Sequence, residues 1–267
     1  MTVRLASQVK PDHDLVPDLD QASTAGASVR KRPRRSKRSE AAAEDQARQE
    51  RIAGAYTFDA SSCLLQEAAF ASDSALNWGS GDAGGQLGSK LSLEAGLRWR
   101  QFSKDEKVRL HELVDANMSQ FYDAVSAWPR TRSEKRRDMA NRDARYILVR
   151  DQNRWIVSFL NYRFVIEEDV DVLYVYELQV DAALRGRGIG GLLLRMSEHL
   201  ASRTRVRKVM LTVLKRNAAA CKFYAKWDYV PSKIDPTFMF PRDEKCYDYC
   251  ILEKPTDDTG NGTDSET

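Results

Sequence analysis

Cysteine and histidine are scarce in this sequence. Its 267 residues include four cysteines and three histidines. The cysteines are too few and too scattered for a disulfide scaffold. Cys246 and Cys250 have no second pair at metal-ligand spacing, and the histidines lie far apart along the chain. These shortages argue against a disulfide-rich secreted domain and against a zinc site, so we expect a reducing compartment and no bound metal.

Long hydrophobic runs are missing as well. No apolar stretch reaches the roughly 20 residues that a helix needs to cross a bilayer. The first residues, MTVRLASQVKPDHDLVP, lack the apolar segment that signal peptides carry. We therefore expect a soluble protein that has no membrane partner.

A strong overall charge is also lacking, since the net charge is only +3. The chain as a whole is therefore not a basic nucleic-acid binder. Basic residues concentrate in RKRPRRSKR at residues 30–38, where seven of nine residues are Lys or Arg. This run has three interpretations: a nuclear import signal, an anchor to DNA or nucleosomes, or a solvated tail.

The distribution of aromatic and turn residues divides the chain into four parts. Residues 1–50 are nearly free of aromatic residues, and glycines cluster over residues 77–90. One folded domain with extensions fits this pattern. We expect a disordered basic leader over residues 1–50, a helical segment and glycine-rich linker over 51–100, the folded domain over 101–254, and a disordered acidic tail over 255–267.

Within the domain, the hydrophobic period changes from that of helices to that of strands. The order is helices, then antiparallel strands, then strand–loop–helix–strand. This order predicts a mixed α/β sheet of about six strands, with parallel pairing near a glycine-rich loop. Strands are expected over residues 144–151, 154–164, 172–180, 206–214 and 246–254, an acidic turn over 166–171, and helices within 41–70, 103–125, 129–145, 190–204 and 217–229.

The glycine-rich loop lies in ALRGRGIGGLLLR, residues 183–195. Gly186, Gly188 and Gly191 match the dinucleotide fingerprint G-x-G-x-x-G. That fingerprint should open the domain and be followed about 20 residues later by an acidic residue for the ribose. Here the loop falls late, and no Asp or Glu occurs between Glu198 and Asp228. The missing G-K-[ST] also excludes a Walker loop.

A second frame, R-x-x-G-x-G, explains more of the loop. Its glycines let successive backbone N–H groups turn toward an anion at the N-terminus of the following helix. Two arginines add positive charge, so the loop suits a pyrophosphate. The alternative is a tight glycine turn that holds no ligand. The residues expected to contact the ligand are Arg185, Gly186, Arg187, Gly188, Ile189, Gly190 and Gly191.

The segment NAAACKFY at residues 217–224 follows the next strand and reads N-x-x-A-x-x-F-Y. Together, the two motifs at this spacing resemble the Gcn5-related N-acetyltransferase (GNAT) superfamily. The resemblance implies the GNAT fold and acetyl-CoA as cosubstrate, with its pyrophosphate on the glycine loop. It also implies that Leu178, Gln179, Val180, Thr212, Asn217 and Tyr249 contribute to the cosubstrate site. Asn217 has the alternative role of a helix N-cap.

The flanking segments LYVYELQV, RKVMLTVLKRN, NMSQFYDAVSAW and DARYILVRD resemble the N-terminal acetyltransferase D family over roughly residues 95–254. Members of that family acetylate the α-amino group of histone 4 and histone 2A. The resemblance therefore implies histone tails beginning Ser-Gly-Arg-Gly as partners. We expect a monomer that works in the nucleus and the cytoplasm.

The chemistry agrees with an amine acceptor. An α-amino group has a pKa of roughly 7.7–8.0, so little base assistance is needed at neutral pH. Glu177 lies in an otherwise apolar strand, where a carboxylate needs partners or a raised pKa. The family places its general base there; the alternative is a solvated sheet face. Tyr224 is the candidate to protonate the leaving thiolate, and ordinary aromatic packing is its alternative.

Recognition of the histone tail is implied for Tyr122, Trp128, Tyr176 and Tyr249, and for a turn made of Val165, Ile166 and Glu167. Glu167 matches an acidic position of the family, whereas Val165 replaces a residue that is usually acidic. Core packing is the alternative for Tyr122 and Trp128, and a solvated hairpin turn is the alternative for the acidic stretch.

Two other functions remain open on the sequence. One is a GNAT enzyme that acetylates a histone lysine or a small polyamine. The other is a non-enzymatic chromatin module that binds through the basic leader.

Overall fold

The computed structural model describes residues 34–60, 91–122, 132–241 and 247–256. Its centre is a mixed sheet, which within these residues has seven strands in the order β1-β2-β3-β4-β5-β7-β6. All neighbouring pairs are antiparallel except β4 and β5, which are parallel. The strands are β1 (Ser92–Leu97), β2 (Arg145–Arg150), β3 (Ile156–Glu167), β4 (Val170–Val180), β5 (Lys208–Leu214), β6 (Val230–Pro231) and β7 (Tyr249–Pro255).

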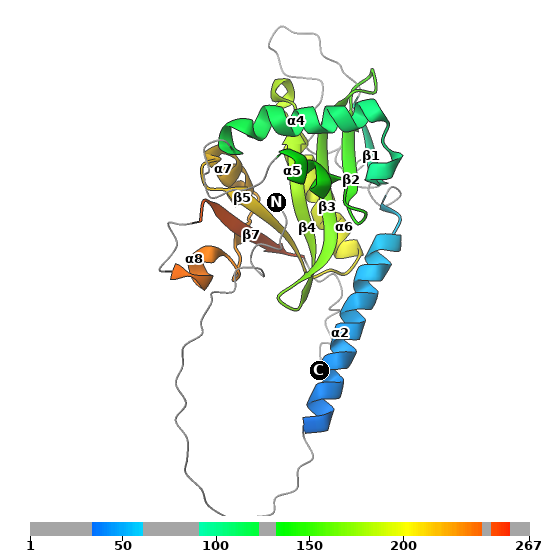
Figure 1. Ribbon diagram of the computed structural model, residues 1–267, viewed down its shortest axis with the longest axis vertical. Helices are drawn as coiled ribbons and strands as arrows, with labels where there is room; N and C mark the ends of the chain where they lie inside the picture. Colours follow the sequence, from blue (N-terminus) through cyan, green and yellow to red (C-terminus); the bar gives the residue numbers. More distant parts are fainter. Residues whose placement is uncertain (1–33, 61–90, 123–131, 242–246, 257–267) are drawn as a thin grey trace, which may run out of the picture.

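Helices cover both faces of the sheet (Figure 1). Side chains of α2, α6 and α7 pack on one face, and α4 and α5 pack on the other. This arrangement is the mixed α/β fold that the sequence predicts. The helices are α2 (Arg34–Thr57), α4 (Lys104–Tyr122), α5 (Arg132–Met139), α6 (Ile189–Arg203), α7 (Ala218–Lys226) and α8 (Pro236–Met239), with the short 3-10 turns η1 (Trp99–Gln101) and η2 (Ala182–Leu184).

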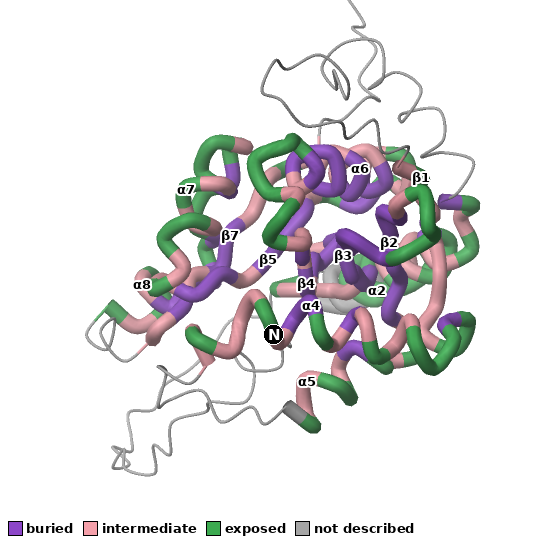
Figure 2. The backbone as a smooth tube through the Cα atoms, turned by 90° about the horizontal axis from the view of Figure 1, so that it is seen from above, coloured by how far each residue is buried: buried purple, intermediate pink, exposed green. Residues whose placement is uncertain are grey.

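Burial follows the two-face arrangement. Figure 2 shows it concentrated along the central strands and on the sheet-facing side of α6. All six residues of β2 are buried, as are the first nine of β3. A strand that is covered on both faces has no solvent-facing side, so it does not need polar residues at alternate positions. This explains why β2 and β3 are mostly apolar.

Helix α2 begins inside the segment expected to be a disordered leader, so the expected boundary at residue 50 falls within a helix. The segment is rich in alanine, glutamate and arginine, which favour helices. Its C-terminal part is fastened to the hairpin between β3 and β4. Arg51 makes two hydrogen bonds, of 3.1 and 2.9 Å, to the buried carboxylate of Asp171. The Tyr56 hydroxyl donates to the Phe164 carbonyl at 2.8 Å and accepts from its N–H at 3.1 Å.

Strand β1 is a second difference, because residues 91–97 were expected within a helical and linker region. The strand has only six residues, and its pairing with β2 shifts register between Ala95 and Leu97. Gly96 lies between them with φ 73°. A short strand that contains a glycine bulge lacks the alternation from which strands are predicted. The expected linker over residues 77–90 and the tail from residue 257 lie outside the described residues.

The functional site depends on a divergence between β4 and β5. These parallel strands pair only from Val172 to Val175 on β4 and from Lys208 to Leu211 on β5. On the other side of β4, the pairing with β3 shifts register between Asn161 and Tyr162, which leaves Tyr176 as the extra residue. A bulge of this kind bends a strand. The carboxyl ends of β4 and β5 therefore separate, and the sheet opens there.

Candidate active site

Two connected hollows occupy the opening between β4 and β5. The larger has a volume of about 710 Å³ and runs along the glycine loop, α6 and α7. The smaller, of about 90 Å³, lies deeper, between β4, β5, α4 and α5. We call them the cosubstrate groove and the inner pocket. Both are lined by Met118, Leu178, Gln179, Asn217, Ala220 and Tyr224, so these six residues mark the junction.

The glycine loop forms one end of the cosubstrate groove. Gly186 and Gly188 adopt φ values of 76° and 82°, which favour glycine, and Gly188 is the N-cap of α6. The first N–H groups of a helix have no partner within it and point at whatever lies beyond its N-terminus. Arg185 and Arg187 are exposed beside them. The loop thus presents backbone donors, a helix dipole and the Arg185 guanidinium to an anion in the groove, which Arg185 lines and Arg187 does not.

Gly190 and Gly191 serve the packing of α6 against α7. A Cβ on Gly191 would lie 2.2 Å from an indole carbon of Trp227, so no side chain fits there. At Gly190, the nearest atom would be a ring carbon of Phe223 at 3.4 Å, which is a close but tolerable contact. The glycine at 191 is therefore required by the approach of α7, which forms the groove's other wall.

The end of β4 supplies further backbone donors. The Asp181 N–H donates to the Val157 carbonyl on β3 at 2.9 Å. Successive residues of a strand direct their backbone groups to opposite sides. The N–H groups of Val180 and Leu178 therefore point away from β3, toward the cosubstrate groove that both residues line.

Glu177 lies in the inner pocket and is only 6% exposed. One carboxylate oxygen, Oε1, forms an ion pair with the Lys135 ammonium of α5. The other, Oε2, accepts a hydrogen bond of 2.8 Å from the side-chain amide of Gln179. A buried carboxylate needs such partners, so Glu177 is a charged group held in a fixed position at the junction of the two hollows.

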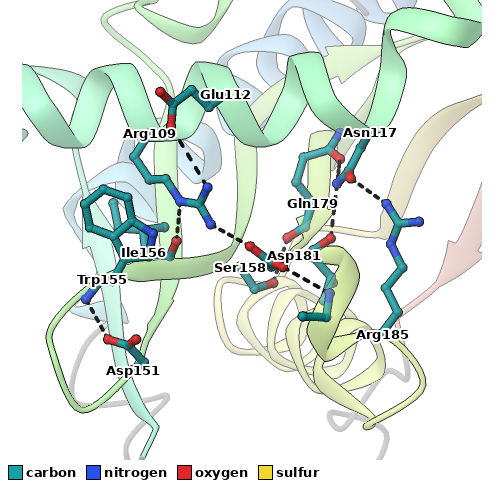
Figure 3. A network of polar contacts seen from close by, with 12 residues as sticks. Arg109, Glu112, Asn117, Asp151, Trp155, Ile156, Ser158, Gln179, Asp181 and Arg185 are labelled. Carbon is teal, nitrogen blue, oxygen red and sulfur yellow. Dashed lines mark hydrogen bonds and ion pairs between the residues drawn. The ribbon is translucent and has the colours of Figure 1, made fainter.

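A chain of side-chain contacts links Glu177 to the glycine loop, and Figure 3 shows its part from Gln179 through Asn117 to Arg185. Gln179 accepts from the amide of Asn117 on α4 at 2.9 Å, and the same amide donates to the Val180 carbonyl at 3.1 Å. The Asn117 side-chain oxygen in turn accepts from the Arg185 guanidinium. The contacts thus run from Arg185 through Asn117 and Gln179 to Glu177, across the floor of the groove.

The second motif forms the opposite wall. The Asn217 side chain caps α7 by accepting from the Ala220 N–H at 3.1 Å, and Asn217 also lines both hollows. The cap and the contact with the groove are thus compatible. Tyr224 is 9% exposed and lies at the junction, and burial raises the pKa of its hydroxyl. Thr212 lines the inner pocket, and its hydroxyl is hydrogen-bonded to that of the buried Tyr174.

The inner pocket is also lined by Tyr122 and Tyr176, two of the residues expected to recognise the acceptor. The Arg163 guanidinium lies over the Tyr176 ring, 4.0 Å from its centroid. Burial raises the pKa of Tyr176 to about 12, against the opposing effect of Arg163. For Glu167, burial first and then the neighbouring Glu168 raise the carboxyl pKa to about 7, while Lys208 lowers it.

The other residues expected to recognise the acceptor do not all lie at the inner pocket. Residues 165–167 end β3 instead of forming a turn; the turn consists of Glu168 and Asp169, whose φ values are 45° and 61°. Two positive φ values in a two-residue loop favour a tight hairpin, which lets β3 run further than expected.

Residues along β3 alternate between the two faces of the sheet. Val165 packs with Tyr174 and Tyr176. Ile166 shares the alternate face with Phe164, which packs against Tyr56 of α2, so the structure does not bring Ile166 to the site. Tyr249 is buried among Tyr174 and Ile251, and it lines neither hollow. Trp128 lies outside the described residues.

Three residues that shape the site were not predicted from the sequence. Lys135 and Asn117 contact the site from α5 and α4, and Arg163 reaches Tyr176 from β3. Lys135 sits in a helix that is charged over most of its length, where one lysine cannot be distinguished from its neighbours. A signal for Asn117 was present, because a polar residue follows the apolar positions Leu113 and Val114 by helical spacing.

No group of three or more His, Cys, Asp or Glu residues in the described ranges is arranged to hold a metal ion. None of the helices described is long and apolar enough to cross a membrane.

Residues 110–229 match the acetyltransferase (GNAT) family. Among solved structures, a nourseothricin acetyltransferase is 18% identical with a TM-score of 0.36, over 43% of this chain and 66% of that protein. The NatC complex bound to Gag peptide and CoA is 17% identical with a TM-score of 0.46, over 62% and 98%. NAA60 of Arabidopsis thaliana in complex with acetyl-CoA is 15% identical with a TM-score of 0.45, over 62% and 98%.

The matched span runs from α4 through α7 and so contains the glycine loop, the divergent β4 and β5, and nearly all of both hollows. The mixed sheet with its opening at the parallel pair matches the GNAT fold. The part of the chain that contains the candidate site, residues 110–229, is therefore similar to the acetyltransferase (GNAT) family.

Proposed function

We propose that this chain is an N-terminal α-amino acetyltransferase that acts on histone 4 and histone 2A tails beginning Ser-Gly-Arg-Gly. The observation that carries the proposal is the position of Glu177, a buried carboxylate at the junction between an anion-binding groove and a small pocket lined by Tyr122 and Tyr176. The choice of histone rests on the sequence resemblance of residues 95–254 to the N-terminal acetyltransferase D family.

Acetyl-CoA fits the cosubstrate groove. Its volume of about 710 Å³ lies in the usual range for small-molecule sites. The backbone N–H groups at the start of α6, together with Arg185 and Arg187, would hold the pyrophosphate. The N–H groups of Leu178 and Val180 would contact the pantetheine amides and polarise the thioester carbonyl. Acetyl-CoA supplies the acetyl group as a thioester.

Glu177 acts as the general base in this proposal. The incoming α-amine is partly protonated at neutral pH and must lose a proton before it can attack. The α-amine would bind beside Oε1 of Glu177, where the Lys135 ammonium lies in this structure. The Lys135 contact shows that an amino group fits at this position. Tyr224 is in place to donate a proton to the leaving thiolate. No cysteine lines either hollow within the described residues, which favours direct transfer to the amine.

Charge near the inner pocket supports an arginine-containing tail. Glu167 does not line the inner pocket, but it interacts electrostatically with Tyr176, which does, and in this proposal its carboxyl is the partner for the guanidinium of the third residue. Val165 supplies no second carboxylate, and Glu168 and Asp169 are exposed in the adjacent turn. Selection for arginine then depends mainly on Glu167.

The test is acetyl transfer to a Ser-Gly-Arg-Gly peptide with a free or a blocked N-terminus. The proposal predicts turnover of the free peptide only. The blocked Ser-Gly-Arg-Gly peptide has no acceptor amine, so a blocked peptide extended by one lysine and a free polyamine are tested beside it. Activity on either of these would show a lysine or polyamine enzyme instead, and no activity on any acceptor would leave the non-enzymatic chromatin module.

We also propose that the protein is a monomer and that it works in both the nucleus and the cytoplasm. Its entry into the nucleus would depend on the basic run at residues 30–38. Removing residues 1–33 takes away three of the seven basic residues of that run but leaves α2 and its Arg51 contact in place. We expect peptide turnover to survive this truncation while nuclear accumulation falls. Loss of turnover would show that the leader takes part in catalysis.

A further inference from the structure

Lys135 is held at the catalytic carboxylate by the fold around it. The C-terminal end of α5 is fixed to the sheet at two points. The Asp138 carbonyl accepts from the buried Arg163 guanidinium at 2.5 Å, and the Met139 carbonyl accepts from the Tyr146 hydroxyl at 2.6 Å. Lys135 lies one helical turn before these anchors. Its side chain is only 12% exposed and ends against Oε1 of Glu177.

The surroundings of the Lys135 amine are those of an acetyl acceptor. The inner pocket that it lines is also lined by Leu178, Asn217 and Tyr224, which belong equally to the cosubstrate groove. An amine in the inner pocket therefore faces both the base and the site where the thioester of acetyl-CoA would lie. A lysine that served only as a counter-ion would need the carboxylate but not this junction.

We propose that Lys135 is an acetylation site modified by the enzyme's own active site in the same polypeptide. Glu177 takes one proton from the Lys135 ammonium. The neutral Nζ attacks the acetyl carbonyl, a bond forms between Nζ and the acetyl carbon, and the bond from that carbon to sulfur breaks. The second proton passes from nitrogen to the leaving thiolate, so the products are N-acetyl-lysine, CoA thiol and one proton. The inference rests on the proposed role of Glu177 as base.

Acetylation would also change the site. It removes the positive charge that pairs with Glu177 and adds the bulk of an acetyl group to a pocket of about 90 Å³. The modified lysine and an incoming α-amine cannot share the position beside Oε1. Peptide and Lys135 therefore compete for the same acetyl group, and a saturating peptide should protect Lys135.

The experiment incubates the full chain with acetyl-CoA and follows the modification by intact mass and peptide mapping. We expect one acetyl group at Lys135, added with a first-order rate constant that does not depend on protein concentration. This rate constant should fall about tenfold or more in Glu177→Gln. Lys135→Arg keeps the charge but should lose the modification. Lys104→Arg, at an exposed lysine on α4, should keep it.

Three results would overturn the inference. These are no acetyl group at Lys135 in a protein that acetylates the peptide, a rate that rises with protein concentration, or equal labelling of Lys135 and Lys104, which would be chemical acetylation. A protein that modifies Lys135 but not the Ser-Gly-Arg-Gly peptide would instead contradict the proposed acceptor and leave the inference standing. A protein that modifies neither contradicts both.

Discussion

The side-chain amide of Asn117 on α4 donates to the side-chain oxygen of Gln179 on β4 at 2.9 Å, and Gln179 donates onward to Glu177 at 2.8 Å. Because Asn117 also accepts from Arg185, one residue of α4 joins the glycine-loop end of the groove to Glu177, the proposed base. Glu177 is therefore positioned by contacts that reach well beyond its own strand.

Replacing Asn117 with Ala removes this connection. Gln179 loses a partner and can turn away from Glu177, so we expect kcat to fall about tenfold through misplacement of the base. The Kd for acetyl-CoA should change less than about twofold, because the backbone donors of the glycine loop remain. Steady-state kinetics and calorimetric titration check both values. Glu112→Ala, on the same helix but outside both hollows, is the control; a drop confined to acetyl-CoA affinity would argue against a positioning role.

The contact between Arg51 and Asp171 predicts a large effect on stability. The Asp171 side chain is 1% exposed, so Arg51→Ala leaves a buried charge without its partner. We expect the free energy of unfolding to fall by about 3 kcal/mol. Arg48→Ala is the matched control, since its carboxylate partners are 61–88% exposed and the loss should stay below about 1 kcal/mol. Equal losses in urea unfolding would show that α2 is not fastened through Asp171.

Alanine should be tolerated at Gly190 but should destabilise the protein at the adjacent Gly191. In Gly191→Ala the new methyl group would overlap the Trp227 ring, and the displaced α7 should cost about 1–3 kcal/mol. Gly190→Ala meets Phe223 at an ordinary close distance and should cost less. Thermal unfolding of the two variants gives the comparison. A more stable Gly191→Ala would mean that α7 does not approach α6 as closely as described.

The raised pKa of Glu167, about 7, predicts a pH-dependent preference for arginine. Below this pKa the carboxyl is neutral and attracts a guanidinium weakly; above it the carboxylate is charged. The ratio of kcat/KM for Ser-Gly-Arg-Gly to that for Ser-Gly-Ala-Gly should therefore rise as the pH passes through about 7. The ratio cancels ionisation of the α-amine, which both peptides share. Glu167→Gln should make it independent of pH; an unchanged profile would remove Glu167 from recognition.

The Glu167 carboxyl should also make the stability of the folded protein depend on pH, but stability should fall with rising pH while the preference for arginine rises. Because its pKa is raised on folding, the folded state binds the proton more tightly than the unfolded state. Its contribution is fully present below about pH 4.5 and is lost as the pH rises through about 7. Glu167→Gln should therefore flatten the decline in stability across this window.

Local patterns were sufficient to predict most strands and the glycine loop, because alternation, helical spacing and glycine position are properties of short segments. The roles expected for the site residues on β4 and in the second motif came from the family resemblance, and only Glu177 was also marked by its place in an otherwise apolar strand. The role of Lys135 could not be predicted, since it depends on how α5 crosses the sheet; for Asn117 the helical spacing indicated the side of α4 but not the contacts with Gln179 and Arg185. Ile166 was assigned to the acceptor site through the family resemblance, which implied a turn at residues 165–167. The two-residue turn at Glu168 and Asp169 instead extends β3, and the alternation of the strand puts Ile166 on the other face.

The central claim is that Glu177 is the base for an α-amine. Its most direct test is single-turnover acetylation of the free Ser-Gly-Arg-Gly peptide by Glu177→Gln with saturating acetyl-CoA. The glutamine keeps the shape of the side chain and a partner for Gln179 but cannot accept the proton. We expect a rate reduced by about a hundredfold or more, with the Kd for acetyl-CoA unchanged. A variant that transfers acetyl at the original rate would contradict the claim.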